Sequence, residues 1–160
     1  MTTSKGFTLI ELLIAISVIS VGIAGALVSM QQSIPALDFA NSRFTASLLA
    51  QEGVEIIKNI RDTNLLHNTI WNDSLSIDGD YEVEYTIPHI SIYADSYLVK
   101  NEHNFYNHML GDDTKFKRKI QITNISSDKI ELEIIVYWRK RGGGEHELIL
   151  KQHIYNWLDR

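Results

Sequence analysis

Glu11 is the residue whose position in this sequence says most about its chemistry. It is the single charged residue in an apolar run of 24 residues, Phe7 to Met30. A carboxylate inside a hydrocarbon layer costs about 2.5 kcal/mol or more, so such a charge normally has a partner and a function. A positive charge 4 Å away would offset about 4 kcal/mol at an effective dielectric constant of 20. We therefore expect Glu11 to have a function and a partner rather than to face lipid alone.

The apolar run is long enough to cross a membrane as a helix. At about 1.5 Å per residue it would span about 36 Å, and a hydrocarbon core is about 30 Å thick. Residues 1–6 form a short polar leader that ends at Lys5-Gly6. Gly22 and Gly25 within the run either let helices approach closely or reflect ordinary membrane-helix composition.

The nine residues from Lys5 to Leu13, KGFTLIELL, resemble the processing site of type IV pilins and type II secretion pseudopilins. The resemblance implies that a prepilin peptidase cuts between Gly6 and Phe7 and that the new amino group of Phe7 is methylated. Lys5, Gly6 and Phe7 are then the processing residues. The resemblance also implies that Glu11 attracts the amino terminus of a neighbouring subunit during filament assembly.

Two other interpretations of this segment stay open. Ala24-Gly25-Ala26 follows an apolar stretch and offers the small-residue site of a secretory signal peptide. A glutamate inside the apolar region and a single lysine before it argue against that interpretation. The segment also fits a plain single-pass anchor with Glu11 near the lipid headgroups.

The remaining candidate groups point to no metal, cofactor or catalytic site. His103 and His108 are five residues apart, which matches no zinc motif. The acidic residues of Trp71–Tyr81 are candidate calcium ligands, but their spacing is not that of an EF-hand, which favours a polar turn. The basic residues of Lys115–Lys119 fit a lysine-protected sheet edge better than a site for an acidic partner or a phosphate. With no nucleophile elbow and no glycine-rich phosphate loop, we expect no enzyme.

Composition indicates one small folded domain behind the apolar run. The chain has 160 residues, a formal net charge of −5 and no cysteine. Residues 31–160 are enough for one hydrophobic core but not for two. The absence of a basic tail gives no reason to expect nucleic acid as a partner.

The helix is expected to continue beyond the membrane as an amphipathic segment over about residues 35–62. Pro35 can begin that segment or kink a continuous helix. Apolar and small residues recur there at spacings of three and four and form one stripe: Ala46, Leu49, Ala50, Gly53, Ile57 and Ile60. Gly53 costs about 1 kcal/mol relative to Ala, so we expect the backbone of a sheet to approach it closely.

Alternating apolar and polar residues predict an antiparallel sheet over about residues 81–154. The predicted strands are Tyr81–Ile87, Phe116–Thr123, Ile130–Lys140 and Glu145–Ile154. A turn at Ser126–Asp128 sets Ile122 opposite Leu132, Ile120 opposite Ile134 and Phe116 opposite Trp138. A turn at Gly142–Gly144 sets Trp138 opposite Leu148, Val136 opposite Leu150, Leu132 opposite Ile154, Arg139 opposite Glu147 and Arg141 opposite Glu145. Arg118 and Gln152 are the exceptions that this register directs inward, at the sheet margin or at a break in the register.

Residues 88–114 are expected to form a large loop with at most one short strand, which contacts a neighbouring subunit or a target surface.

These patterns together predict an α+β subunit, with a long N-terminal helix packed on a small antiparallel β-meander head. Residues 1–6 are its leader, residues 7–30 its transmembrane and assembly helix, and residues 31–160 its exported head. The function that the resemblance implies is that of a minor subunit of a type IV pilus or a type II secretion pseudopilus, first held in the inner membrane. Its expected partners are other pilin or pseudopilin subunits, prepilin peptidase/methyltransferase, the inner-membrane assembly platform and lipid. The alternatives are a membrane-tethered extracytoplasmic binding module that does not polymerise and, less favoured, a membrane enzyme.

Overall fold

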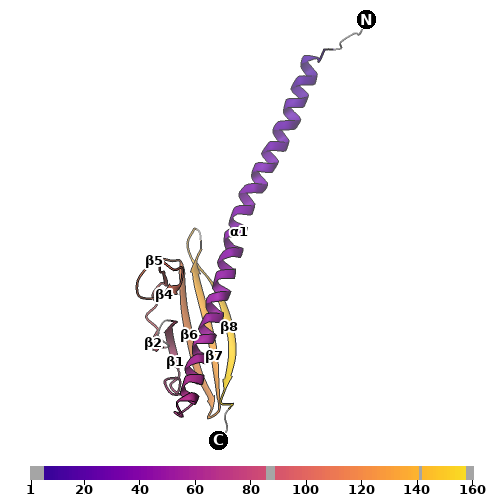
Figure 1. The fold of residues 1–160 in the computed structure, drawn as a ribbon. Helices are drawn as coiled ribbons and strands as arrows, with labels where there is room; N and C mark the ends of the chain where they lie inside the picture. The colour runs from indigo at the N-terminus through magenta and orange to yellow at the C-terminus, as the bar shows by residue number, and fades with distance from the viewer. Residues whose placement is uncertain (1–5, 86–88, 141, 158–160) are drawn as a thin grey trace. The chain divides into compact units, whose positions relative to one another are not determined.

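The computed structural model describes residues 6–85, 89–140 and 142–157 (Figure 1). The first element is the helix α1, Leu9–Leu66. It runs without interruption through Pro35, so the membrane segment and the amphipathic segment are parts of one helix that ends four residues beyond the predicted boundary. The chain divides into two compact units, Met1–Asn41 and Ser42–Arg160, and each is described by itself.

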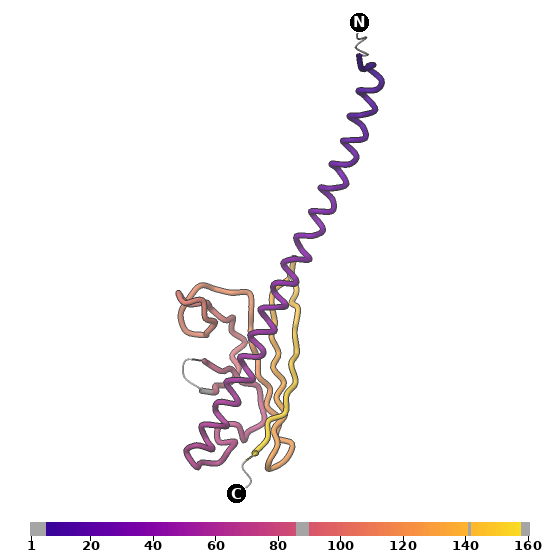
Figure 2. The backbone as a smooth tube through the Cα atoms, turned by 45° about the vertical axis from the view of Figure 1, so that its right-hand side comes forward, coloured from indigo at the N-terminus to yellow at the C-terminus, as the bar shows by residue number. Residues whose placement is uncertain are grey.

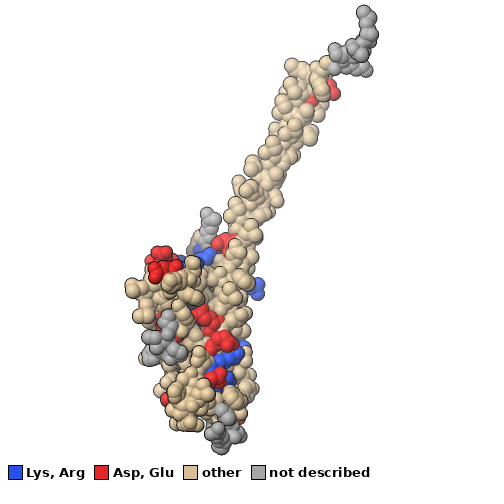
Figure 3. Space-filling view, in the orientation of Figure 1, with Lys and Arg blue, Asp and Glu red and all other residues tan. Residues whose placement is uncertain are grey.

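In the first unit, the helix exposes apolar side chains on all of its faces. Exposed fractions range from 53% at Ile16 to 78% at Leu9 across the large apolar residues up to Met30. This stretch is the one described segment apolar and long enough to cross a membrane, and none of it is buried within the molecule. Figure 3 shows its surface as almost free of charged side chains. A helix that is apolar all round requires lipid or other helices around it.

In the second unit, a five-stranded antiparallel sheet packs against the C-terminal part of α1. The strand order is β2-β1-β6-β7-β8. The strand bounds are β1, Gly79–Glu84; β2, His89–Ile92; β6, Phe116–Ser126; β7, Lys129–Arg139; and β8, Glu145–Tyr155. Figure 2 shows the helix running along the three long strands. The α+β architecture predicted from the sequence is confirmed.

The core of this unit lies between the predicted helix stripe and the inner face of the sheet. Every member of the stripe from Ala46 to Ile60 is buried. The sheet contributes residues that alternate along β6 and β7, since one face of each strand points to the helix. The most completely buried of them are Ile120, Ile122, Ile130, Leu132, Ile134 and Val136.

Gly53 lies against side chains of the sheet. The prediction that the backbone of the sheet approaches it closely is wrong. A Cβ atom added to Gly53 would lie 3.4 Å from Ile120 Cδ1, 3.4 Å from Ile134 Cγ2 and 3.5 Å from Arg118 Cδ. These are close to ordinary van der Waals distances. The glycine therefore makes room for long side chains that reach from β6 and β7 to the helix.

The register between β6 and β7 is as predicted, with Ile120 opposite Ile134 and Phe116 opposite Trp138. The predicted register between β7 and β8 is wrong by two residues. Observed pairs in place of the predicted ones are Trp138 with His146, Val136 with Leu148, Leu132 with Gln152, Ile130 with Ile154 and Arg139 with Glu145. The reason is the turn, which the hydrogen bond from Lys140 N to Gly144 O, 2.9 Å long, centres on Gly142. Arg141 lies outside the described residues. A shift of two leaves each side chain on its predicted face, so the apolar pattern alone does not distinguish the two registers.

Arg118 and the lysines beside it do not lie at a sheet edge, because β6 is the central strand of the sheet. Arg118 is 1% exposed and its register with β7 is regular, so both predicted explanations, a margin and a break, are wrong for it. Its guanidinium donates to the carbonyls of Leu49 (3.2 Å) and Val83 (3.0 Å) and lies 3.4 Å from Glu52. Gln152 does lie at the margin, exposed on the edge strand β8.

Residues 89–113 contain more regular structure than the predicted loop. After β2, three strands of two residues each form a second antiparallel sheet in the order β4-β3-β5. The bounds are β3, Val99–Lys100; β4, Tyr106–Asn107; and β5, Asp112–Asp113. Strands of two residues have no detectable alternation in sequence, which is why the pattern analysis missed this sheet.

Candidate functional site

The first turn of α1 carries the residues that the sequence singles out. Thr8 precedes the helix and Glu11 lies in its first turn. Glu11 N donates to Thr8 Oγ1 at 3.4 Å, and Thr8 N donates to Glu11 Oε2 at 3.5 Å. Leu12 N also donates to Thr8 O at 3.2 Å. This is the reciprocal arrangement of a capping box, which satisfies amide donors that the helix itself leaves unpaired.

The capping box gives Glu11 a local role that sequence reasoning missed, although the spacing Thr-x-x-Glu was visible. The carboxylate also lies at the positive end of the helix dipole, where a negative charge contributes about 0.3–1 kcal/mol at an exposed site. Both box contacts are near the long limit for hydrogen bonds, so they hold the carboxylate weakly. Among the described residues, Glu11 forms no ion pair and is exposed. The carboxylate is thus accessible to a cation from another chain.

Gly6 and Phe7 lie ahead of the helix and are exposed, Phe7 to 83%. A Cβ atom on Gly6 would meet nothing within 4 Å. Packing against the described residues therefore gives no reason for a glycine here. Lys5, the third predicted processing residue, lies outside the described residues.

Gly22 and Gly25 likewise have open space around them, since an added Cβ atom at either would meet nothing within 4 Å. The nearby hydroxyls are satisfied within the helix: Ser17 Oγ donates to Leu13 O at 2.8 Å and Ser20 Oγ to Ile16 O at 2.7 Å. A helix whose polar groups are bonded internally and whose small residues are exposed is suited to close contact with other helices in lipid.

The candidate calcium ligands of Trp71–Tyr81 are used in separate contacts. Asp78 Oδ1 accepts from Asn124 N (2.8 Å) and Asn124 Nδ2 (2.9 Å), and these two bonds, the main-chain one first, lower the pKa of Asp78. Asp80 pairs with Lys119 at 3.0 Å. No group of three potential metal ligands gathers anywhere in the described part of the chain.

The basic residues of β6 also have partners in the head. Lys117 Nζ lies 3.0 Å from Asp95, and their hydrogen bond raises the pKa of Lys117 and lowers that of Asp95. Two cations lie near the ring of Tyr97, with Lys117 Nζ 4.6 Å and Arg139 Cζ 4.1 Å from its centroid. These contacts attach residues 95–97 to the sheet.

His103 and His108 are not brought together. His103 is exposed and lies 3.6 Å from Glu102, whereas His108 is inserted between Glu82 and Glu84 of β1. The pattern Glu-Val-Glu in β1 predicts two carboxylates on one face, but nothing in the sequence indicates that His108 reaches them.

Comparison with known proteins bears on the N-terminal segment. Residues 1–27 match the family described as the prokaryotic N-terminal methylation motif. No curated protein and no solved structure matches the chain. The motif, together with the long apolar helix that begins within it at Leu9, supports a type IV pilin-like or pseudopilin-like chain that is a substrate of prepilin peptidase and begins as a membrane-anchored precursor.

Proposed function

We propose that this chain is a non-catalytic minor subunit of a type IV pilus or a type II secretion pseudopilus. The observation that carries the proposal is the methylation motif at residues 1–27, which includes the start of a helix whose large apolar side chains are exposed up to Met30 and whose one charged residue in that stretch is Glu11. Among the described residues of the first unit, nothing covers this helix. Lipid before assembly, and the helices of other subunits afterwards, would supply the apolar surroundings that it needs.

The proposed sequence of events starts with the precursor in the inner membrane and its head on the extracytoplasmic side. Prepilin peptidase cuts between Gly6 and Phe7, which replaces an amide with a charged amine, and Phe7 is then methylated. On an assembly platform, the Phe7 amine of one subunit pairs with the exposed Glu11 carboxylate of its neighbour. That pairing is strong where water is excluded, because the attraction between two charges grows as the dielectric constant falls.

The chain offers a way to separate the assembly role of Glu11 from its capping role. A capping box accepts glutamine in place of glutamate, so Glu11→Gln keeps the cap and removes the charge. Thr8→Val does the reverse, because it removes the capping hydroxyl and keeps the carboxylate. We expect Glu11→Gln to be cleaved and anchored normally but to be absent from sheared filaments or from crosslinked high-mass assemblies. We expect Thr8→Val to enter them.

The readouts are the intact mass of the membrane form and immunoblots of the filament fraction. A membrane form that begins at a methylated Phe7 supports the processing step. Incorporation of Glu11→Gln at the wild-type level would show that Glu11 only caps the helix, and the proposed pairing would be wrong. A chain that retains residues 1–6 in cells with active peptidase would overturn the proposed processing.

The second candidate is a membrane-tethered extracytoplasmic binding module that does not polymerise. An apolar pocket of about 500 Å³ in the head favours it, lined by Ile60, Thr63, Asn64, Ser74, Ile77, Tyr81 and Ile90. Its size is in the range of small-molecule sites. For such a module, Glu11→Gln would leave function intact, whereas Ile77→Asp at the pocket rim would remove it.

A further inference from the structure

Residues 101–111, here called the His108 loop, lie between two main-chain anchors. Leu98 N donates to Phe116 O at 2.8 Å, and Thr114 N donates to Leu98 O at 3.1 Å. The loop contains one two-residue strand, β4, and leads into β5; both strands pair with β3, which precedes the loop. Three of its large apolar side chains are exposed: Phe105, Met109 and Leu110. The loop therefore depends on side-chain contacts for its position on the sheet.

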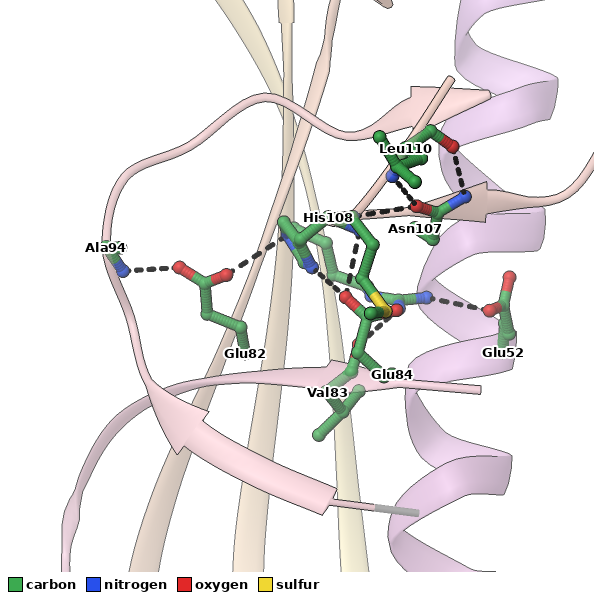
Figure 4. Close-up of polar contacts among 10 residues, drawn as sticks. Glu52, Glu82, Val83, Glu84, Ala94, Asn107, His108 and Leu110 are labelled. Atoms are coloured by element: carbon green, nitrogen blue, oxygen red, sulfur yellow. Dashed lines mark hydrogen bonds and ion pairs between the residues drawn. The ribbon is translucent and has the colours of Figure 1, made fainter. Parts of the chain in front are cut away.

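The principal polar contact is the imidazole of His108, which lies between two carboxylates of β1 (Figure 4). His108 Nδ1 lies 2.7 Å from Glu84 Oε1, and Nε2 lies 3.2 Å from Glu82 Oε2. The three side chains are largely buried, with exposed fractions of 12% for His108, 8% for Glu82 and 20% for Glu84. Both glutamates alternate with the core residue Val83, so they project from the sheet face away from the helix core.

A carboxylate faces each of the two ring nitrogens, so only a doubly protonated ring presents an N–H group to both. The imidazolium has two N–H donors, whereas the neutral ring has one donor and one lone pair. Loss of the proton would turn a lone pair toward a buried carboxylate oxygen. The Nε2 contact with Glu82 does not have hydrogen-bond geometry, so its attraction is that of an ion pair and depends on the charge of the ring.

The lysines of the neighbouring strand β6 are paired with other carboxylates, Lys119 with Asp80 at 3.0 Å and Lys117 with Asp95 at 3.0 Å. Glu82 and Glu84 are the titratable groups that face the ring. Arg118 of β6 also contacts β1, and its guanidinium is bonded to the carbonyl of Val83 and lies 3.4 Å from Glu52. Glu84 Oε2 is buried without a hydrogen-bond partner among the described residues.

The same two carboxylates also hold main-chain donors. Glu84 Oε1 accepts from His108 N at 2.9 Å, and Glu82 Oε1 accepts from Ala94 N. Asn107 fixes the turn beside His108, because its Oδ1 accepts from Met109 N (2.7 Å) and Leu110 N (3.1 Å). The carboxylates of Glu82 and Glu84 thus connect β1 both to the ring of His108 and to main-chain amides.

We propose that the contact of His108 with Glu82 and Glu84 holds the His108 loop on β1 in a pH-dependent way. This proposal does not depend on the function proposed for the N-terminal helix. The protonated ring holds the loop and its exposed apolar side chains against β1. As the pH rises and the ring loses its proton, two buried carboxylates face each other across a neutral imidazole, and the loop loosens.

Hydrogen exchange of the full chain in detergent micelles tests this directly, followed by mass spectrometry between about pH 5.5 and 8.5, the range in which imidazoles titrate. Rates are corrected for the intrinsic effect of pH, and peptides from β7 serve as the internal reference. We expect protection of residues 101–111 to fall by on the order of tenfold across this range, while β7 stays constant. His103→Gln, the exposed histidine of the same loop, is the matched control and should behave as the wild type.

His108→Gln should lower protection of the loop at the acidic end and remove its pH dependence. Glu84→Gln should reduce the pH dependence and leave β7 unchanged, which keeps the test decisive if His108→Gln folds poorly. A wild-type loop whose protection does not change with pH would overturn the proposal. A pH response that persists in His108→Gln, or disappears in His103→Gln, would also overturn it.

Discussion

The two parts of α1 have the same secondary structure but opposite relations to their apolar residues. Along residues 9–41, apolar side chains occupy every face and are exposed. Along residues 42–66, one face is buried under the sheet while residues such as Gln51 and Glu55 remain exposed. The difference shows that a segment can form a helix whether or not its apolar residues are buried. The apolar face of residues 42–66 is buried within the chain, whereas the apolar residues of 9–41 require lipid or other chains to cover them.

The largest expected effect is on the stability of the head, and it is tested with one isoleucine from each part of α1. Ile57 is 0% exposed and Ile23 is 55% exposed. Ile57→Ala should lower the free energy of unfolding of the head by about 2–5 kcal/mol, because it removes buried methyl groups and leaves a cavity. Ile23→Ala should change it by less than about 0.5 kcal/mol. Urea titrations in detergent, followed by tryptophan fluorescence, measure both. Equal losses would mean that the two segments do not differ as described.

Glycines provide an intermediate test of the same comparison. Gly53→Leu should destabilise the head by about 1–3 kcal/mol, because the new side chain meets Ile120, Ile134 and Arg118. Gly22→Leu should leave the unfolding of the head unchanged, because nothing surrounds Gly22 in this chain. If the proposed assembly holds, Gly22→Leu should instead reduce filament incorporation, since small residues let helices approach. Gly53→Ala is the control and should be tolerated, with a gain in helix propensity of up to about 1 kcal/mol.

The smallest expected effect concerns acid stability of the head. The bonds from Asn124 N and Nδ2 lower the pKa of Asp78 in the folded state. A carboxyl with a lowered pKa stabilises the fold above its ordinary pKa, and that contribution is lost as the pH falls toward the folded-state value. The unfolding midpoint should therefore fall on acidification, and less steeply in Asp78→Asn than in the wild type. Asn124→Ala, which keeps the main-chain donor, should lie between them. Identical acid slopes for the three proteins would contradict this assignment.

Sequence patterns predict which face of a helix or strand is buried, but they do not predict strand register or the partners of buried polar side chains. The helix stripe and the inward faces of β6, β7 and β8 follow from periodicity alone, because side-chain direction repeats every 3.6 residues in a helix and every two in a strand. The β7–β8 register was wrong because a shift of two residues preserves those faces. Arg118 was misplaced because a buried arginine is acceptable only with acceptors that the sequence does not reveal, here two main-chain carbonyls and Glu52.

The sequence by itself determined the N-terminal motif, the presence of a long N-terminal helix, the α+β architecture and the sides on which the strands carry their apolar residues. These depend on local order along the chain. Only the tertiary structure decided the turn centred on Gly142, the second small sheet and the insertion of His108 between Glu82 and Glu84, whose contact with Glu84 joins residues 24 apart. Such contacts depend on how loops close in three dimensions, and the energies of alternative closures differ by amounts that no periodic pattern records.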